Sequence, residues 1–76
     1  MTLGEYRVGL DFNPSGDPDV HAIKRMAAEF IDLCQTMRDK HSIGAETGRL
    51  LSLAQTHAED AAMWAVKAIT KKPFTE

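Results

Sequence analysis

The sequence predicts an all-α fold: an antiparallel two-helix hairpin with an extended N-terminal arm, assembled as a homo-oligomeric helical bundle. Two long segments with helical periodicity, joined by a brief connection at residues 42–44, favour the hairpin. The second segment is apolar over more than half of its circumference, so it requires cover on more than one side. Because 76 residues cannot supply that cover alone, we expect several copies of the chain to associate.

We expect one hairpin domain over residues 1–76, which begins with an extended arm over residues 1–16. Apolar side chains occupy every second position from Tyr6 to Phe12, the period of a half-buried strand or an extended strap. The segment 13–18 then ends the arm, because it holds two prolines and a glycine.

The first helix is expected over residues 17–41. Asp17 suits the N-cap and Pro18 suits the first helical position, while basic residues near position 40 complement the carboxyl end. Its apolar stripe, spaced three and four residues alternately, comprises Val20, Ile23, Ala27, Phe30, Cys34 and Met37. Since Cys34 lies in this stripe, we expect a buried structural thiol.

The second helix is expected over residues 45–72, and Pro73 ends it. A seam of mostly small side chains runs along it, comprising Leu51, Ala54, Ala58, Ala61, Ala65 and Ala68. Two flanking rows are bulkier, one with Leu50, Leu53, His57 and Trp64 and the other with Ala62, Val66 and Ile69. An alanine seam allows another helix to approach closely, while the bulky rows need cover of their own.

The composition argues against several classes of protein. A net charge of −2 argues against binding to polymeric nucleic acid. One cysteine cannot form an internal disulfide framework or a cysteine-rich zinc site. Charged residues interrupt every apolar stretch, so we expect no membrane association and no signal peptide, and a cytoplasmic location.

No catalytic, metal or cofactor site is expected. Glu29 and Asp32 lie one turn apart, as do His57 and Asp60, but a solvated polar face explains these pairs better than a metal site. Ser15, Ser42 and Ser52 have no local histidine signature of a nucleophile–base pair, and Cys34 lies in the apolar stripe, so no activated nucleophile is indicated. We therefore expect that the protein is not an enzyme.

Lysines beside aromatic residues are the candidate binding groups. Lys67 lies three residues beyond Trp64 on one helix face, and Lys24 lies about two turns into the first helix. A flat ring can stack on a nucleobase and an ammonium can neutralise a phosphate, so a nucleotide site is one interpretation. The alternatives are that Tyr6 and Phe12 pack the arm on the hairpin, that Lys24 extends from a helix interface, and that Trp64 belongs to an interfacial core.

Three motifs carry a family resemblance. They are the pair Ile23 and Lys24 behind an aromatic-containing arm, the segment SLAQT at 52–56, and the segment AMWAVKAI at 62–69 with two lysines before Pro73. Over most of residues 12–74 the chain resembles the phage anti-CBASS cyclic-nucleotide sponges, helical-hairpin proteins related to the sponges that counter Thoeris defence.

The resemblance implies a phage anti-defence protein that acts in the cytoplasm of the host bacterium. Such proteins bind cyclic oligonucleotide immune messengers and sequester them without cleavage. Family members form compact homo-oligomers, typically hexamers, and hold cyclic dinucleotides such as cyclic GMP–AMP between protomers. Some members also hold cyclic trinucleotides, such as cyclic tri-adenylate, at a separate site.

The resemblance also implies site residues. Lys24 matches the family lysine that contacts a phosphate of the cyclic dinucleotide, and Lys67 stands where an arginine faces cyclic trinucleotides. Phe12 corresponds best to the base-stacking tyrosine, with Tyr6 second. The full set of expected ligand-binding residues is Tyr6, Arg7, Phe12, Asn13, Lys24, Trp64 and Lys67. Met26 replaces a family threonine, and the lysine at position 67 lacks the bidentate fork of arginine.

Two questions stay open at the level of sequence. The side chain of Asn13 is expected either to bind a base edge or phosphate, or to form an Asx-turn ahead of Pro14. The alternatives to a sponge are a non-catalytic scaffold or adaptor hairpin that binds a protein partner, and an enzyme that degrades the same messengers.

Overall fold

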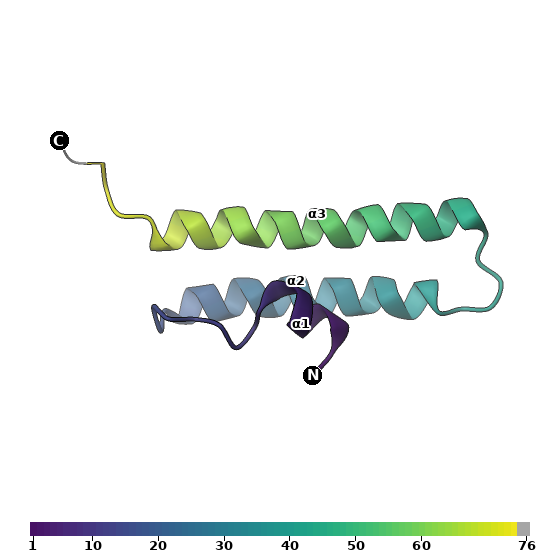
Figure 1. The fold of residues 1–76 in the computed structure, drawn as a ribbon, viewed down its shortest axis with the longest axis horizontal. Coiled ribbons are helices and arrows are strands. Elements are labelled where there is room, and N and C mark those ends of the chain that lie inside the picture. Colours follow the sequence, from purple (N-terminus) through teal and green to yellow (C-terminus); the bar gives the residue numbers. More distant parts are fainter. Residues whose placement is uncertain (75–76) are drawn as a thin grey trace.

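A computed structural model describes residues 1–74, which form three helices: α1 (Leu3–Val8), α2 (Pro18–Arg38) and α3 (Ala45–Thr70). The two long helices α2 and α3 run antiparallel, and α1 packs mainly against α2, with a smaller contact to α3 (Figure 1). The molecule is elongated, with extents of 55 × 26 × 12 Å. The all-α hairpin is therefore confirmed, while Thr75 and Glu76 of the expected domain lie outside the described residues.

Helix α2 begins where its sequence signals predict. The Asp17 side chain accepts a hydrogen bond from the backbone N–H of Asp19 at 2.8 Å, and Pro18 occupies the first turn. The helix ends at Arg38 rather than residue 41, because Asp39 already caps it and the following residues reverse the chain.

Helix α3 ends at Thr70, short of the expected residue 72. Lys71 is already extended, with ψ of 131°. Pro73 restricts the residue before it to extended conformations, so the chain must leave the helix before Lys72.

The expectation of an extended arm is wrong over residues 3–8, which form α1. The Thr2 side chain accepts from the Glu5 N–H at 3.1 Å, and the Glu5 carboxylate accepts from the Thr2 N–H at 2.8 Å. This capping box starts the helix, and Gly9 ends it in the left-handed region at φ 65°. These local signals outweigh the alternating apolar pattern.

The Glu5 carboxylate also holds α1 to α2, since its other oxygen lies 3.0 Å from the Arg25 guanidinium. The hydrogen bond from the Thr2 backbone, and then the bond to Arg25, hold the pKa of Glu5 below its usual value. The ionised Glu5 carboxylate therefore stabilises the capped form of α1.

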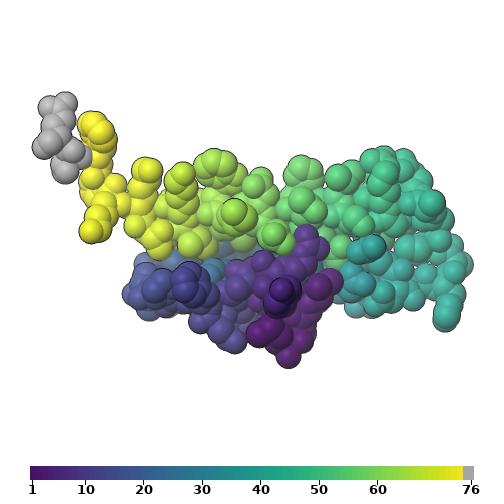
Figure 2. All heavy atoms as spheres, viewed as in Figure 1, coloured from purple at the N-terminus to yellow at the C-terminus, as the bar shows by residue number. Residues whose placement is uncertain are grey.

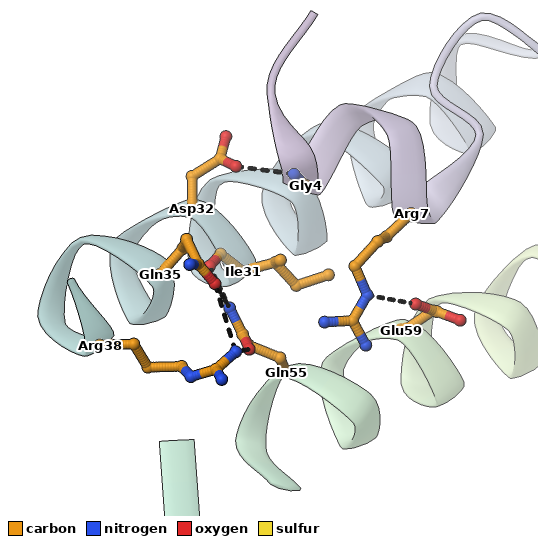
Figure 3. A network of polar contacts seen from close by, with 8 residues as sticks. All are labelled: Gly4, Arg7, Ile31, Asp32, Gln35, Arg38, Gln55 and Glu59. Carbon is orange, nitrogen blue, oxygen red and sulfur yellow. Dashed lines mark hydrogen bonds and ion pairs between the residues drawn. The ribbon is translucent and has the colours of Figure 1, made fainter. Parts of the chain in front are cut away.

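Close contact between backbones positions α1 on α2. The Gly4 N–H donates to the Asp32 carboxylate at 2.7 Å, so Asp32 has a structural partner rather than only a solvated position (Figure 3). A Cβ atom on Gly4 would lie 2.1 Å from the Ala28 carbonyl oxygen. Only glycine allows this approach.

The buried face of α2 differs from the expected stripe. Its buried residues are Val20, Lys24, Ala28, Ile31 and Cys34. Of the expected stripe, Val20 and Cys34 are buried, while Phe30 and Met37 are exposed. The buried Cys34 thiol agrees with the expectation for that residue. The row through Lys24 is buried because Ala28 leaves room for α1 and the Lys24 ammonium finds acceptors in the N-terminal segment.

The buried face of α3 centres on Gln55 and Ala62, beside the expected alanine seam. Gln55 is fully buried; its amide nitrogen donates to the Ile31 carbonyl and to the Gln35 side chain, both at 3.1 Å. Its amide oxygen accepts from Arg38 at 3.1 Å (Figure 3). This polar layer sets the register of α3 against α2, because a shift along the helices would leave buried amide groups without partners.

Large apolar side chains also remain on the surface. They form one row on α2, comprising Met26, Phe30, Leu33 and Met37, and one on α3 that includes Leu50, Leu53 and Trp64. Within residues 1–74, neither long helix has an apolar stretch of the length that a membrane crossing requires.

Candidate ligand groove

The N-terminal segment and the carboxyl-terminal half of α3 enclose a groove. It consists of two adjoining hollows of about 430 and about 300 Å³, and both are lined by Lys24, Val66 and Thr70. The groove follows the line where the purple and violet N-terminal segment meets the yellow-green part of α3 (Figure 2). Arg7, Glu59 and Lys67 line the larger hollow, and Phe12 and Asn13 line the smaller one.

Lys24 lies where the two hollows meet. Its side chain is only 8% exposed, and its ammonium donates to the Gly9 carbonyl at 3.0 Å and to the Phe12 carbonyl. The same ammonium lies 5.6 Å from the centre of the Phe12 ring. An ammonium has three N–H donors, so two carbonyl partners leave one donor and the full positive charge for a ligand. Lys24 thus also holds the loop that carries Phe12.

Arg7 enters the larger hollow from α1. Its Nε donates to a Glu59 carboxylate oxygen at 2.8 Å, which ties α1 to α3 (Figure 3). Because 52 residues separate the two partners, spacing along the chain carries no signal of this pair. Glu59 is the charged groove residue that sequence reasoning missed.

Lys67 reaches the larger hollow from α3 and is paired with Trp64, as their spacing predicts. The Lys67 ammonium lies 5.3 Å from the centre of the Trp64 ring, within the range of a cation–π contact. Trp64 itself is 63% exposed and lies outside the groove, beside shallower hollows that it shares with Lys67, Asp60 and Lys71. The described structure therefore leaves the indole uncovered.

Of the two candidate stacking residues, Phe12 lies in the groove. Phe12 is 72% exposed although it lines the smaller hollow. Tyr6 is equally exposed but projects from α1 without lining either hollow. A ring at the edge of the groove has a free face on which a flat base can stack.

Asn13 has a local structural role. Its amide nitrogen donates to the Asp17 carbonyl at 3.0 Å, and its amide oxygen accepts from the Ser15 hydroxyl at 2.7 Å. The Gly16 N–H donates to the Asn13 carbonyl at 3.1 Å, closing a turn in which Gly16 has φ of 66°. These contacts give Asn13 a part in the turn, although its amide oxygen accepts from the Ser15 hydroxyl and not from the Ser15 backbone N–H that an Asx-turn would use. They hold Asn13 in the lining of the smaller hollow.

The groove has the charge of an anion-binding site. Arg7, Lys24 and Lys67 supply three cations and Glu59 one carboxylate, leaving two net positive charges in a protein whose overall charge is −2. Val66 and Met63 provide an apolar wall beside these charges. Among residues 1–74, no three histidine, cysteine, aspartate or glutamate side chains lie close enough to hold a metal ion.

Comparison with known proteins gives the family of the chain. The family model described as Acb2/Tad1, hairpin domain, matches residues 5–70, which span the groove and both long helices. Neither the curated proteins nor the solved structures gave a match. With most of its length matched, the chain belongs to the Acb2/Tad1 hairpin family of anti-defence cyclic-nucleotide sponges.

Proposed function

We propose that the groove binds a phosphate and a base of a cyclic oligonucleotide immune messenger, which the protein sequesters without cleaving it. One observation carries the proposal: three cations converge on a groove whose edge presents the exposed ring of Phe12. A phosphate placed between Arg7, Lys24 and Lys67 leaves the adjoining base within reach of that ring. The ligand class is cyclic dinucleotides such as cyclic GMP–AMP, with cyclic tri-adenylate as a second class.

We propose further that the binding unit is a homo-oligomer, with a hexamer as the expected form. The apolar row on α2 repeats at intervals of four, three and four residues and is exposed in a single chain. Such spacing is typical of a seam that packs against another helix. A two-fold contact would bring two copies of the groove residues to one ligand, matching its two phosphates and two bases.

The upper part of the expected energy range reaches tight binding. Stacking contributes roughly 1–3 kcal/mol per base, and a charge-assisted hydrogen bond about 1.5–3 kcal/mol. Two of each total about 5–12 kcal/mol before ordering costs, while micromolar affinity needs about 8 kcal/mol. Sub-micromolar binding therefore requires an ordered N-terminal segment, which the Lys24 contacts to Gly9 and Phe12 support.

The first experiment is titration calorimetry of the purified protein with cyclic GMP–AMP and cyclic tri-adenylate. Bound ligand is then released by heat and analysed by chromatography. We expect sub-micromolar binding with intact ligand recovered. Recovery of a linear product would instead indicate a degrading enzyme, and an oligomer that binds neither compound would favour the scaffold or adaptor alternative.

Lysine variants test the placement of the ligand. We expect Lys24→Met and Lys67→Met to weaken binding of cyclic GMP–AMP at least tenfold, while the oligomer persists on gel filtration. Lys67→Met is the cleaner variant. The Lys67 ammonium lies over the Trp64 ring and makes no hydrogen bond to the described residues, so its loss should disturb the fold little. Lys40→Met, an exposed lysine outside the groove, is the matched control. Equal affinity of the Lys67 and Lys40 variants would contradict a phosphate in the larger hollow.

A further inference from the structure

The Arg7–Glu59 ion pair places a carboxylate inside a groove that is otherwise cationic. The two side chains are 23% and 34% exposed and come from α1 and α3 (Figure 3). Glu59 lines the larger hollow together with Arg7, Lys24 and Lys67. A phosphate that enters this hollow therefore meets a negative charge already bound to one of its three cations.

The unused donors of Arg7 are suited to a phosphate. Within residues 1–74 the guanidinium makes one hydrogen bond, from Nε to Glu59, so both terminal nitrogens keep their donors. A guanidinium can bind two oxygens of one phosphate in parallel, whereas an ammonium acts as a point charge. The other two cations are lysines, one bound to backbone carbonyls and one lying over an indole ring.

We propose that Glu59 is a specificity-determining carboxylate that competes with the phosphate of the ligand for Arg7. The inference rests on the proposed function in one respect, that the ligand carries a phosphate. A ligand with enough negative charge displaces Glu59 or shares Arg7 with it, and gains bidentate contacts. An uncharged nucleoside cannot do so and is rejected. Glu59 thus lowers the affinity for every anion, so that only a ligand with enough negative charge gains the contacts of Arg7.

The competition predicts opposite effects on binding and on stability. Glu59→Gln keeps the size of the side chain and an oxygen that accepts from Arg7, but it removes the charge. We expect this variant to bind a phosphate ligand about two- to fivefold more tightly, the range in which a partly exposed ion pair acts. Its melting temperature should fall, because the link between α1 and α3 weakens. A purely structural role for Glu59 would lower both quantities.

The test is a double-mutant cycle with Arg7→Gln, Glu59→Gln and the double variant, using cyclic GMP–AMP and inorganic pyrophosphate as probes. Arg7→Gln should bind both probes more weakly, and the gain from Glu59→Gln should disappear when Arg7 is absent. Glu46→Gln is the control, since Glu46 pairs with Arg49 at 2.6 Å on the same helix, about 20 Å from Glu59 at 1.5 Å per residue.

Each outcome separates this inference from the proposed function. If pyrophosphate follows the expected pattern and cyclic GMP–AMP binds no variant, competition for Arg7 stands and the cyclic dinucleotide assignment fails. If the wild-type protein binds cyclic GMP–AMP but Glu59→Gln matches Glu46→Gln, competition is overturned and the sponge assignment stands. An equal gain from Glu59→Gln with and without Arg7 also overturns it, as does a wild-type protein that binds neither probe.

Discussion

Replacement of Gly4 by alanine tests whether α1 positions the groove. The new Cβ atom would lie 2.1 Å from the Ala28 carbonyl oxygen and 2.8 Å from a carboxylate oxygen of Asp32. Carbon and oxygen ordinarily approach to about 3.3 Å, so α1 must move by about 1 Å against a backbone that cannot yield. That movement breaks the 2.7 Å hydrogen bond from the Gly4 N–H to Asp32.

The expected loss follows from these contacts. The hydrogen bond to the Asp32 carboxylate is worth about 1.5–3 kcal/mol. The ion pair of Arg7 with Glu59, which ties α1 to α3, is partly exposed, so it adds about 0.2–1 kcal/mol. Full undocking of α1 sets the upper limit, so we expect Gly4→Ala to lower the free energy of unfolding by about 2–4 kcal/mol. Ligand affinity should fall at least tenfold, because Arg7 moves with α1.

The same substitution elsewhere in the chain should have the opposite sign. Gly48 lies inside α3, and a Cβ atom there would meet only the Ile43 side chain at 3.8 Å, an ordinary contact. Gly48→Ala should therefore stabilise the protein by about 0.5–1 kcal/mol through helix propensity. Urea unfolding followed by circular dichroism at one protomer concentration measures both variants. Unchanged stability of Gly4→Ala would refute the close approach of α1 and α2.

Two further predictions concern the polar contacts of the hairpin. Gln55→Ala should lower the free energy of unfolding by about 2–4 kcal/mol, since it removes three hydrogen bonds and leaves a cavity. Urea unfolding measures this loss, and Thr56→Ala, at the neighbouring exposed position, is the control. An equal loss in both variants would contradict the buried polar layer. The pKa of the Glu5 carboxyl is lowered in the folded protein. Glu5 therefore stabilises α1 fully at pH values above its ordinary pKa of 4.5, and this stabilisation is lost as the pH falls through the lowered pKa. Amide NMR of Thr2 should report that loss in acid, and a titration that survives in Glu5→Gln would disprove the assignment.

Much of the hairpin could be predicted because its signals are local. Asp17 and Pro18 start α2, and Pro73 limits the end of α3. The spacing of Trp64 and Lys67 predicts their contact, since residues three apart share a helix face. Helix α1 also has local signals in Thr2, Glu5 and Gly9, which the alternating apolar pattern of the same segment obscures.

The candidate groove could be predicted only in part. Residue type and resemblance predict three of the ligand-binding residues, Lys24, Lys67 and Phe12, and all three line the groove. Their roles in binding stay predictions. The contacts of the Lys24 ammonium with two carbonyls could not be foreseen, because they depend on the turn after Gly9. Trp64 and Tyr6 share the aromatic chemistry of Phe12 but lie outside the groove.

The sequence by itself determined the two long helices and their hairpin, because caps, prolines and periodicity act within a few residues. Only the tertiary structure decided which faces of these helices meet. Burial of Gln55 and Lys24 rotates the contact away from the most apolar stripe. The pairing of Arg7 with Glu59 likewise depends on where α1 docks, and docking is decided by a glycine small enough for two backbones to touch.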